Sequence, residues 1–503
     1  MSNRLFDALF RAGAPDALAI EAPERRLTYG DLQHETARFA RTLADLGVTP
    51  GDRIVVQIHK SVAGLILYLA CVRAGAVIVP LNPAYTHSEL AHFIADAEPA
   101  LIVCDPSKHD GFAAIAGAAR IETLDRAGEG SLAARAAASP ADFQTVARTD
   151  AALAAICYTS GTTGRSKGAM LSHRALASNA ETLAALWRFT ADDVLIHALP
   201  IYHVHGLFVA VNVALMAGAA MIVQPRFDAE AVIDAMPRAT AMMGVPTFYT
   251  RLLASPRLTR ERAQSMRVFI SGSAPLLAST HVQWAQRTGQ AILERYGMTE
   301  TGMNASNPYE GARVAGAVGY ALPGVDLRIA AEGGGEGVRA GQIGVVEVKG
   351  PNLFSGYWRD PGKTAQAFAA DGWFKTGDLG YFDNDGYLHL VGRGADLIIT
   401  GGLNVYPAEV EDAIDAVAGV VESAVIGLPH ADLGEAVTAL VVAGTPGATE
   451  LAIRTALETR LAGFKRPRAI LFVPELPRNA MGKVVKASLR QTHANLYAET
   501  AAD

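Results

Sequence analysis

The sequence predicts an α/β protein in which a large N-terminal domain of parallel sheets with helices, together with a β-rich subdomain, precedes a small α+β C-terminal domain. The chain has 503 residues, which is too many for a single hydrophobic core. Strand-like apolar runs alternate with amphipathic helical patterns through its first part, as in parallel sheets covered by helices. Gly- and Pro-rich segments with β character follow, and a compact α/β block ends the chain. We predict two domains, 1–394 and 395–503.

The first predicted elements are strand–helix pairs. In each pair a short apolar run leads into a longer run with helical spacing, and such pairs build parallel sheets. The pairs are Arg53–Gln57 with Ser61–Ala74, and Ala76–Pro80 with His87–Ala97.

One apolar stretch, Leu207–Val223, approaches the length of a membrane span. Asn212 interrupts it and Gly218 breaks it, so we predict a buried helix that runs into a strand. The start of the chain has an early acidic residue and no long apolar core, which argues against a secretory signal.

The later elements are a hairpin and a compact terminal block. Phe382–Tyr387 begins like a calcium loop, but no Glu stands at the twelfth position, so we predict a tight hairpin turn. A short block that mixes helices and strands is typical of a small separate domain. In this block we expect helices at Pro407–Ala416 and Glu450–Leu461 and strands at Val420–Gly427 and Ala436–Val442.

Composition describes a globular protein without a strong charge bias. Hydrophobic residues make up 50% of the chain and charged residues 19%. The 44 Lys and Arg against 50 Asp and Glu leave a net charge of −6, so we expect neither nucleic acid nor an anionic membrane as a partner. Cys71, Cys104 and Cys157 lie in apolar runs without metal-ligand spacing, which indicates core residues in a reducing compartment, and we expect the cytoplasm.

The run Tyr158–Gly168 follows a predicted buried strand and combines glycines, hydroxyl side chains, an Arg and a Lys. Glycines let backbone N–H groups converge on one point, hydroxyls add donors and the cations supply charge, so the run suits a polyphosphate. It is not a Walker A loop, because Ser166 rather than Gly precedes Lys167. Any three or four of these residues also fit a flexible surface turn; the complete run after a strand favours phosphate binding.

Two further clusters suit the rest of a nucleotide. The small-residue turn Ser271–Pro275 follows a predicted strand and would let a planar base approach the backbone. The stretch Glu294–Thr301 carries an aromatic residue that can stack on a base. Within it, Thr299 and Glu300 suit Mg²⁺ bound together with phosphate oxygens.

Two more clusters lie towards the C-terminus. The carboxylate of Lys375–Asp378 could accept hydrogen bonds from both ribose hydroxyls, and Arg393 follows in the sequence. Pro477–Lys483 places a Lys on a Gly-flanked loop. Each cluster alone is more often a turn, a surface charge or a capped helix end, so the evidence lies in their joint occurrence in this order.

In this order the clusters resemble those of the acyl-CoA synthetase and adenylate-forming superfamily, which includes luciferases and the adenylation domains of peptide synthetases. The resemblance covers essentially the full length of the chain, with specific motifs at Tyr158–Gly168, Tyr296–Glu300, Thr376–Asp378 and Gly482–Lys483. It implies that a carboxylate reacts with ATP and Mg²⁺ to give an acyl-adenylate and pyrophosphate. A CoA thiol then displaces AMP. Substrate and CoA supply the nucleophiles, so no catalytic nucleophile or general base is required.

The resemblance also implies roles for the matching residues. Lys483 would bridge the substrate carboxylate and the α-phosphate, and it forms the catalytic group with Glu300, Thr299 and His203. Asp378 and Arg393 would hold the ribose. The remaining contacts would be Thr159, Ser160, Gly161, Thr162, Thr163, Gly164 and Lys167 for the β- and γ-phosphates, Ser273, Ala274 and Pro275 for the adenine, Glu294, Tyr296, Gly297 and Met298 for the nucleotide, and Glu300 with Thr159 for the metal.

In such enzymes the small C-terminal domain is mobile and rotates between the two half-reactions, here about Gly392–Asp396. Ala395 stands where the family usually has Lys or Asp. We expect the rotation to persist, because the neighbouring Gly394 still permits the backbone change. Gly401 and Gly402 could let the pantetheine arm of CoA pass close to the backbone.

Arg295 is the residue that indicates which acid is the substrate. It directly precedes the Tyr296–Glu300 motif, where family members that handle neutral acids mostly carry an uncharged residue. A buried cation is costly unless an anion meets it, and the second carboxylate of a dicarboxylic acid could take a bidentate pair from the guanidinium. The alternative is an exposed arginine paired with Glu294 or Glu300.

Three stretches of the chain closely resemble malonyl-CoA synthetases: Glu294–Asn304, which contains this arginine, Leu199–Leu207 and Pro407–Glu411. By that resemblance Val204, Met303 and Ser273 would line a pocket small enough for malonate or methylmalonate. Two alternatives stay open within the same chemistry, namely another short or aromatic acid and a carrier protein loaded in trans. A third is a catalytically silent nucleotide-binding protein, against which Lys483, Glu300 and the phosphate loop argue.

CoA recognition is less legible in the sequence. A basic group near the C-terminus could meet the CoA phosphates, although a solvated face explains most of its members equally well: Lys465, Arg466, Arg468, Lys483, Lys486 and Arg490. Acetylation of Lys483 by a lysine acetyltransferase would remove its charge and stop adenylation.

Overall fold

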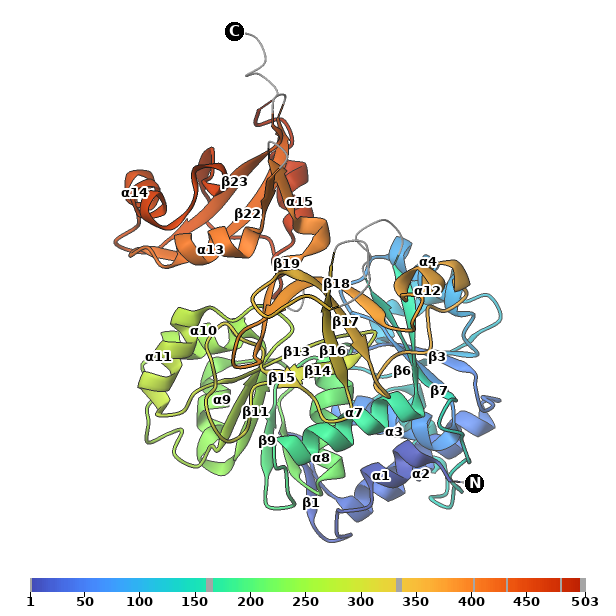
Figure 1. The fold of residues 1–503 in the computed structure, drawn as a ribbon. Helices are drawn as coiled ribbons and strands as arrows, with labels where there is room; N and C mark the ends of the chain where they lie inside the picture. Colours follow the sequence, from blue (N-terminus) through green and yellow to red (C-terminus); the bar gives the residue numbers. More distant parts are fainter. Residues whose placement is uncertain are drawn as a thin grey trace.

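Our computed structural model describes residues 2–159, 166–331, 337–400, 403–430, 433–479 and 482–497. A large body carries three sheets, and a smaller unit built by the last hundred or so residues lies against one end of it (Figure 1). This arrangement confirms the predicted α/β class with a β-rich part and an α+β C-terminal unit. The short 3-10 helix Gly394–Asp396 stands where we place the domain boundary, which stays a prediction.

The six-stranded sheet is parallel except for its last pair. Its order is β6 (Arg120–Thr123), β5 (Leu101–Cys104), β3 (Arg53–Gln57), β4 (Val77–Pro80), β7 (Leu153–Thr159) and β8 (Lys167–Ser172), and only β7 and β8 run antiparallel. The predicted strand at 53–57 is confirmed, and that at 76–80 begins one residue later.

The nine-stranded sheet is parallel from β1 to β13, and its outer strands β2, β14 and β15 are antiparallel. Predominantly parallel sheets are covered by helices on their faces, as here (Figure 1). The order is β15 (Tyr320–Ala321), β14 (Gly302–Ser306), β13 (Leu293–Met298), β12 (Val268–Ser271), β11 (Ala241–Gly244), β9 (Val194–His197), β10 (Ala220–Val223), β1 (Leu18–Glu21) and β2 (Arg26–Thr28).

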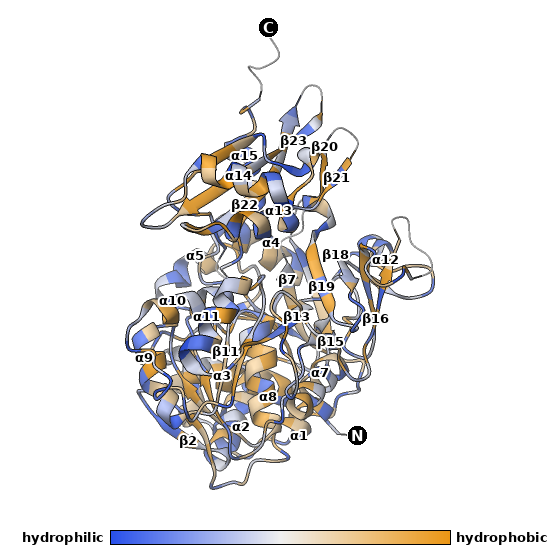
Figure 2. Cartoon of the chain, turned by 60° about the vertical axis from the view of Figure 1, so that its left-hand side comes forward, coloured by the Kyte–Doolittle hydropathy of each residue, from blue (hydrophilic) through white to orange (hydrophobic). Residues whose placement is uncertain are grey.

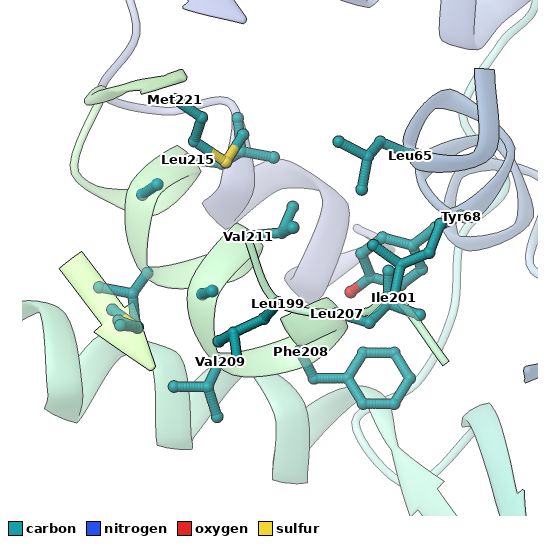
Figure 3. Close-up of a cluster of buried hydrophobic side chains, with 14 of the residues drawn as sticks. Leu65, Tyr68, Leu199, Ile201, Leu207, Phe208, Val209, Val211, Leu215 and Met221 are labelled. Carbon is teal, nitrogen blue, oxygen red and sulfur yellow. The ribbon is translucent and has the colours of Figure 1, made fainter. Parts of the chain in front are cut away.

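The main core contains helix α3 (Val62–Ala74), in which every residue except Arg73 is buried. A helix that is apolar all round belongs in an interior. Leu65 and Tyr68 of this helix face Phe208 and Val211 across the core (Figure 3).

The stretch Leu207–Val223 folds as predicted, as helix followed by strand. A π-helical turn, η2 (His205–Ala210), leads into α8 (Val211–Met216) and then into β10. Gly218 takes a φ of 74° between them, in the left-handed region that favours glycine. Among the described helices, none has both the length and the apolar character that crossing a bilayer requires.

The β-rich part is an antiparallel sheet of β16 (Asp326–Ala330), β17 (Gly344–Lys349), β18 (Phe374–Phe382) and β19 (Leu388–Arg393). The predicted hairpin turn between β18 and β19 is confirmed. The Asp383 carboxylate accepts hydrogen bonds from the backbone N–H groups of Asp385 and Tyr387, which holds the turn closed.

The C-terminal unit has its own apolar clusters, and its strands β22 and β23 are strongly hydrophobic (Figure 2). These strands are longer than predicted, because their pairing continues to His430 and Gly434. Arg490 forms an ion pair of 2.5 Å with Asp396 at the start of the unit. The elements are β20 (Ile398–Thr400), β21 (Leu403–Val405), α13 (Pro407–Asp415), β22 (Val420–His430), β23 (Gly434–Ala443), α14 (Glu450–Arg460), β24 (Ala469–Phe472) and α15 (Lys486–Thr492).

The remaining helices pack on the two large sheets, except α12, which contacts β18 of the four-stranded sheet. They are α1 (Arg4–Leu9), α2 (Tyr29–Asp45), α4 (His87–Ala97), α5 (His109–Ala113), α6 (Ser131–Ala138), α7 (His173–Leu186), α9 (Ala229–Ala235), α10 (Pro246–Ala254), α11 (Ala278–Thr288) and α12 (Pro361–Ala367). The thiols Cys71, Cys104 and Cys157 are buried and free, as predicted for core residues.

Candidate active site

The residues that flank the predicted phosphate loop lie on the paired antiparallel strands β7 and β8. Thr159 is the last residue of β7 and Lys167 the first of β8, and the two are register partners. The Lys167 ammonium lies 5.0 Å from the centre of the Tyr357 ring. Residues Ser160, Gly161, Thr162, Thr163 and Gly164 lie outside the described residues, as do Gly401 and Gly402.

The predicted ribose residues Asp378 and Arg393 form a connected group with Tyr296, and we call this group the Asp378 cluster. Asp378 and Arg393 are register partners on β18 and β19, and Arg393 Nε lies 2.7 Å from Asp378 Oδ1. The Tyr296 hydroxyl donates to Asp378 Oδ2 at 2.5 Å. Burial, together with the Asp378 charge, raises the pKa of Tyr296, which keeps the phenol a donor. Three strands thus fix one carboxylate in place.

Glu300 is buried, with 5% of its surface exposed, and it accepts a hydrogen bond of 3.1 Å from the Tyr357 hydroxyl. Burial raises the pKa of its carboxyl group, as expected for an anion held away from water. A cation bound beside it would relieve that cost. After burial, the Glu300 charge contributes to the raised pKa of the Cys157 thiol on β7. Side chains two residues apart on a strand share a face, so Thr159 lies on the face of Cys157.

These residues fit Mg²⁺ as a substrate-bound ion. The described residues contain no group of three or more His, Cys, Asp or Glu that could hold a metal by themselves. Mg²⁺ does not need such a group, because it is commonly held by one or two carboxylates together with substrate phosphates and water. Glu300 supplies such a carboxylate, while Thr299 is half-buried next to it.

Lys483 reaches the Asp378 cluster from the C-terminal unit. Its side chain keeps solvent access, yet desolvation by the surrounding protein, followed by the charge of Arg393, lowers its pKa. Asn479 Oδ1 accepts from the Lys483 backbone N–H at 3.0 Å. A Cβ added to Gly482 would lie 2.9 Å from Thr247 Oγ1 of α10, so this loop packs directly on the large body.

The predicted adenine turn follows β12. Ser273 takes a φ of 73°, which is rare for a residue other than glycine, and Ala274 and Pro275 follow it at the surface side of the turn. Glu294 is buried beneath it and accepts from the Leu276 backbone N–H at 3.3 Å. Burial raises the pKa of Glu294 to about 8, so the side chain is mostly protonated near neutral pH. The structure therefore places Glu294 as a support of this turn.

Gly297 and Met298 belong to the tight β13–β14 pair that presents the motif. Gly297 is the register partner of Met303, and Met298 that of Gly302. A Cβ on Gly297 would lie 2.1 Å from the Gly302 carbonyl oxygen, so only glycine fits.

The acid-side residues form a second group, the Arg295 cluster: Arg295, His205 and Ser273. Arg295 is 2% exposed, and the exposed, ion-paired alternative weighed for it is therefore excluded. Within the described residues its Nε and Nη2 atoms have no hydrogen-bond partner. Its guanidinium lies over Gly272, where a Cβ would stand 2.5 Å from Cζ. Burial lowers the pKa of Arg295 to about 9, which leaves the group charged near pH 7.

His205 completes this cluster with an unused polar atom, and Ser271 carries another beside Glu294, its register partner on β13. His205 Nδ1 lies 3.2 Å from Ser273 Oγ. In the described part of the chain, His205 Nε2 and Ser271 Oγ are buried without a partner. Buried polar groups are normally paired, so unpaired ones of this kind indicate a missing ligand or water. The charge of Arg295, after burial, contributes to the lowered pKa of His205.

The structure places the other predicted acid-side residues as follows. Val204 is buried beside η2, and Met303 lies opposite Gly297, away from Ser306, the register partner of Arg295. The His203 ring lies at a tilt beside the Tyr202 ring, and burial lowers the pKa of His203 to about 4.

Sequence reasoning missed His205 and Tyr357. His205 rather than His203 contacts Ser273, and only the π-helical geometry of η2 decides between two histidines that are two residues apart. Tyr357 reaches Glu300 from a loop 57 positions away along the chain, and no local spacing marks it.

Comparison with known proteins gives the context of this site. The family profile described as "AMP-binding enzyme" matches residues 9–358, and that described as "AMP-binding enzyme C-terminal domain" matches residues 409–483. The curated indoleacetate–CoA ligase of Aromatoleum aromaticum is 36% identical over 492 residues, which cover 95% of each chain. The malonate–CoA ligase of Arabidopsis thaliana is 33% identical over 95% of this chain and 87% of its own.

Among solved structures, ATP-bound MatB from Rhodopseudomonas palustris is 57% identical, covers 99% of this chain and 100% of its own, and superposes with a TM-score of 0.97. Apo MatB has the same identity and coverage but a TM-score of 0.85. The predicted resemblance to adenylate-forming enzymes, close to malonyl-CoA synthetases, is confirmed. ATP and Mg²⁺ serve this site, with CoA as the co-substrate.

Proposed function

The chain belongs to the AMP-binding enzyme family, and from this premise we propose that it is an ATP-dependent ligase that joins malonate, and also methylmalonate, to CoA. Ligation of an acid to CoA through an adenylate is the activity of its family. The choice of acid is our inference. It rests on one observation, the buried Arg295 guanidinium whose Nε and Nη2 are without partners in the described residues.

The Arg295 cluster suits the second carboxylate of a dicarboxylic acid. A guanidinium presents two parallel N–H donors that match the two oxygens of a carboxylate. His205 Nε2 adds a further unused polar atom in the same cluster. A neutral fatty or aromatic acid would leave all of these atoms unpaired, at a substantial cost in free energy. Ser273, Val204 and Met303 remain our proposed lining of a short acyl pocket.

The first half-reaction brings two anions together. A malonate carboxylate oxygen attacks the α-phosphorus of ATP, the bond to the bridging oxygen breaks, and pyrophosphate leaves. We propose that Lys483 contacts both the attacking carboxylate and the α-phosphate, since cations placed where charge develops lower such barriers. Its place beside Asp378 and Arg393 supports this role. Bound Mg²⁺ would screen the phosphate charges, with Glu300, Thr299 and Thr159 near it.

The nucleotide roles of the other residues also remain proposals. In the Asp378 cluster, Asp378 would accept from the ribose hydroxyls while Arg393 and Tyr296 hold it in place. In the second half-reaction the CoA sulfur attacks the acyl carbon, AMP leaves and the thiol proton goes to solvent. The hydroxyl and glycine residues of Thr159–Gly164, together with Lys167, would bind the β- and γ-phosphates. Ala274 and Pro275 would line the adenine, and Gly297 and Met298 would contact the nucleotide. His203 would lie beside the acid-binding pocket.

A panel of acids tests the proposal. Pyrophosphate release is measured with malonate, methylmalonate, butyrate, indoleacetate and ferulate before CoA is added, which also separates an enzyme from a silent nucleotide-binding protein. The wild type should favour malonate, and Arg295→Ala should lose about a hundredfold or more in kcat/KM for malonate but little for butyrate. Arg313→Ala is the control, because Arg313 is a partly buried arginine that donates only to backbone carbonyls. An Arg295→Ala enzyme with unchanged malonate kinetics would refute the assignment.

We infer that residues 395–503 form a mobile domain that rotates about Gly392–Asp396 between the half-reactions and brings Gly401 and Gly402 towards the pantetheine arm. The family usually has a polar residue where Ala395 stands, and Gly394 should supply the flexibility. If adenylation is normal but thioester formation is nearly absent and Ala395→Lys restores it, this view is wrong.

We further propose that a lysine acetyltransferase can act on Lys483 in the cytoplasm. The side chain keeps solvent access, and acetylation removes the charge that the first half-reaction uses. The buried free thiols Cys71, Cys104 and Cys157 support a reducing compartment. Acetylated enzyme that still releases pyrophosphate at the normal rate would contradict the regulatory role.

A further inference from the structure

A buried lysine lies behind the acid side of the site. Lys60 follows β3 and is 7% exposed. Its Nζ atom lies 2.6 Å from His197 Nδ1 and 2.6 Å from the His197 carbonyl oxygen. No carboxylate forms an ion pair with it among the residues that the structure describes. A buried amine without a counter-charge is costly, so its two short hydrogen bonds to one residue need an explanation.

The hydrogen bonds fix the protonation of His197. Its Nε2 atom lies 2.8 Å from the Gly206 carbonyl oxygen, which can only accept, so Nε2 carries the proton. Nδ1 is then the bare nitrogen and accepts from Lys60. Burial, with the Lys60 charge, lowers the pKa of His197 to about 3, in agreement with a neutral ring. Lys60 thereby holds His197 in the one tautomer that can bind Gly206.

Gly206 connects this pair with the Arg295 cluster. It lies in η2, where its backbone packs so closely on the Pro200 carbonyl that a Cβ would stand 1.9 Å from that oxygen. The preceding residue is His205, whose Nδ1 contacts Ser273 and whose ring lies within the electrostatic reach of Arg295. A shift of the Gly206 carbonyl would therefore move His205 in the acid pocket.

The position of the pair in the topology supports a functional role. In the six-stranded sheet β4 and β5 flank β3, and in the nine-stranded sheet β10 and β11 flank β9, so the chain reverses its direction of winding at β3 and at β9. Ligand sites of α/β sheets form at the carboxyl ends of strands at such reversals. Lys60 follows the end of β3 and His197 ends β9, so their contact joins the two reversal points.

We propose that Lys60 is a positioning residue for acid selection: through His197 it holds the Gly206 carbonyl and so keeps His205 in place beside Arg295. The inference rests on the proposed malonate function, because it assigns Arg295 and His205 to the second carboxylate. It adds a residue from the other sheet to the determinants of that choice.

The test measures kcat/KM for malonate and for butyrate in Lys60→Met, which keeps the length of the side chain but removes its donors. Lys108→Met is the matched control, since Lys108 is a part-buried lysine bonded to Gln57 Oε1 at 3.1 Å, with no contact to His197. We expect the malonate-to-butyrate ratio to fall about tenfold in Lys60→Met and to stay unchanged in the control, as for residues that couple through one network. The KM for ATP should not change in either variant.

A second variant covers the case that Lys60→Met does not fold. His197→Asn keeps an acceptor near Lys60 but loses the bond to Gly206, and it should lower the same ratio. The proposal is overturned if both acids lose activity equally, or if the ratio moves no more than in Lys108→Met. Failure of the malonate assignment is recognised separately, because then the wild type itself would not prefer malonate to butyrate.

Discussion

The Asp378 cluster and the Arg295 cluster lie in the same site but differ in how their charges are satisfied. In the first, Asp378 is paired with Arg393 and receives the Tyr296 hydroxyl. In the second, Arg295 and His205 keep buried donor or acceptor atoms that no described residue meets. A pre-satisfied group can bind any nucleotide without rearrangement, whereas an unsatisfied one gains most from the ligand that completes it. Under the proposed function, the difference would separate the part that serves the reaction from the part that selects the acid.

The largest loss of activity should come from substitution of Lys483, which is a member of neither cluster. Lys483→Ala should lower the rate of pyrophosphate release by about a thousandfold with every acid, because it removes the cation at the reacting atoms. Stopped-flow detection of pyrophosphate with malonate and butyrate measures it. Thioester formation from supplied acyl-adenylate should survive. A loss confined to malonate would instead mean that Lys483 selects the acid together with the Arg295 cluster, which would contradict the proposed division of roles.

The next effect sharpens the comparison on the acid side. Arg295→Lys keeps a positive charge but loses the fork of parallel donors, and kcat/KM for malonate should fall by about thirtyfold. Butyrate kinetics should change by no more than about threefold. Steady-state assays with both acids check the ratio. Full malonate activity in this variant would mean that charge alone, without bidentate geometry, selects the acid.

A smaller effect is expected on the nucleotide side. Tyr357→Phe removes the hydrogen bond to Glu300, and kcat should fall roughly fivefold to tenfold with all acids alike, since one bond to a charged group is lost. The Mg²⁺ concentration for half-maximal rate should rise as well, because Glu300 is less well held. A titration of Mg²⁺ in both enzymes gives the result, and unequal losses among acids would speak against it.

The smallest effect concerns stability and pH. Burial raises the pKa of Glu294 to about 8 in the folded chain, against about 4.3 for a free glutamate. The neutral form is the one that the fold favours, so this contribution to stability is complete below about pH 4 and is lost as the pH rises to about 8. Between pH 5 and pH 8 the Tm of the wild type should therefore fall relative to that of Glu294→Gln. Parallel Tm curves over that range would contradict the role of Glu294 as a buried neutral support.

Much of the fold could be predicted from local patterns. The strand at Arg53–Gln57, the helix at His87–Ala97 and the hairpin at Phe382–Tyr387 are all marked by spacing and turn residues that lie next to each other in the chain. The site was partly predictable for the same reason, because each motif is a short continuous segment of the chain. Arg295 could be singled out because it directly precedes the Tyr296–Glu300 motif, where family members that handle neutral acids mostly carry an uncharged residue.

The remaining site residues depend on distant contacts. Tyr357 meets Glu300, and Lys60 meets His197 across 137 positions, only after two sheets have packed together. A lysine after a strand carries no local sign that it will be buried beside a histidine. The choice between His203 and His205 likewise depends on the π-helical turn, which no periodicity in the sequence indicates.

The ion pair between Arg490 and Asp396 bears on the proposed rotation of the C-terminal unit. Both side chains remain about a quarter exposed, and a pair of this kind contributes only about 0–1 kcal/mol. Both residues lie within 395–503, so in the proposed rotation the ion pair would move with the C-terminal unit as one body. It would therefore hold the start of that unit to α15 without favouring either arrangement.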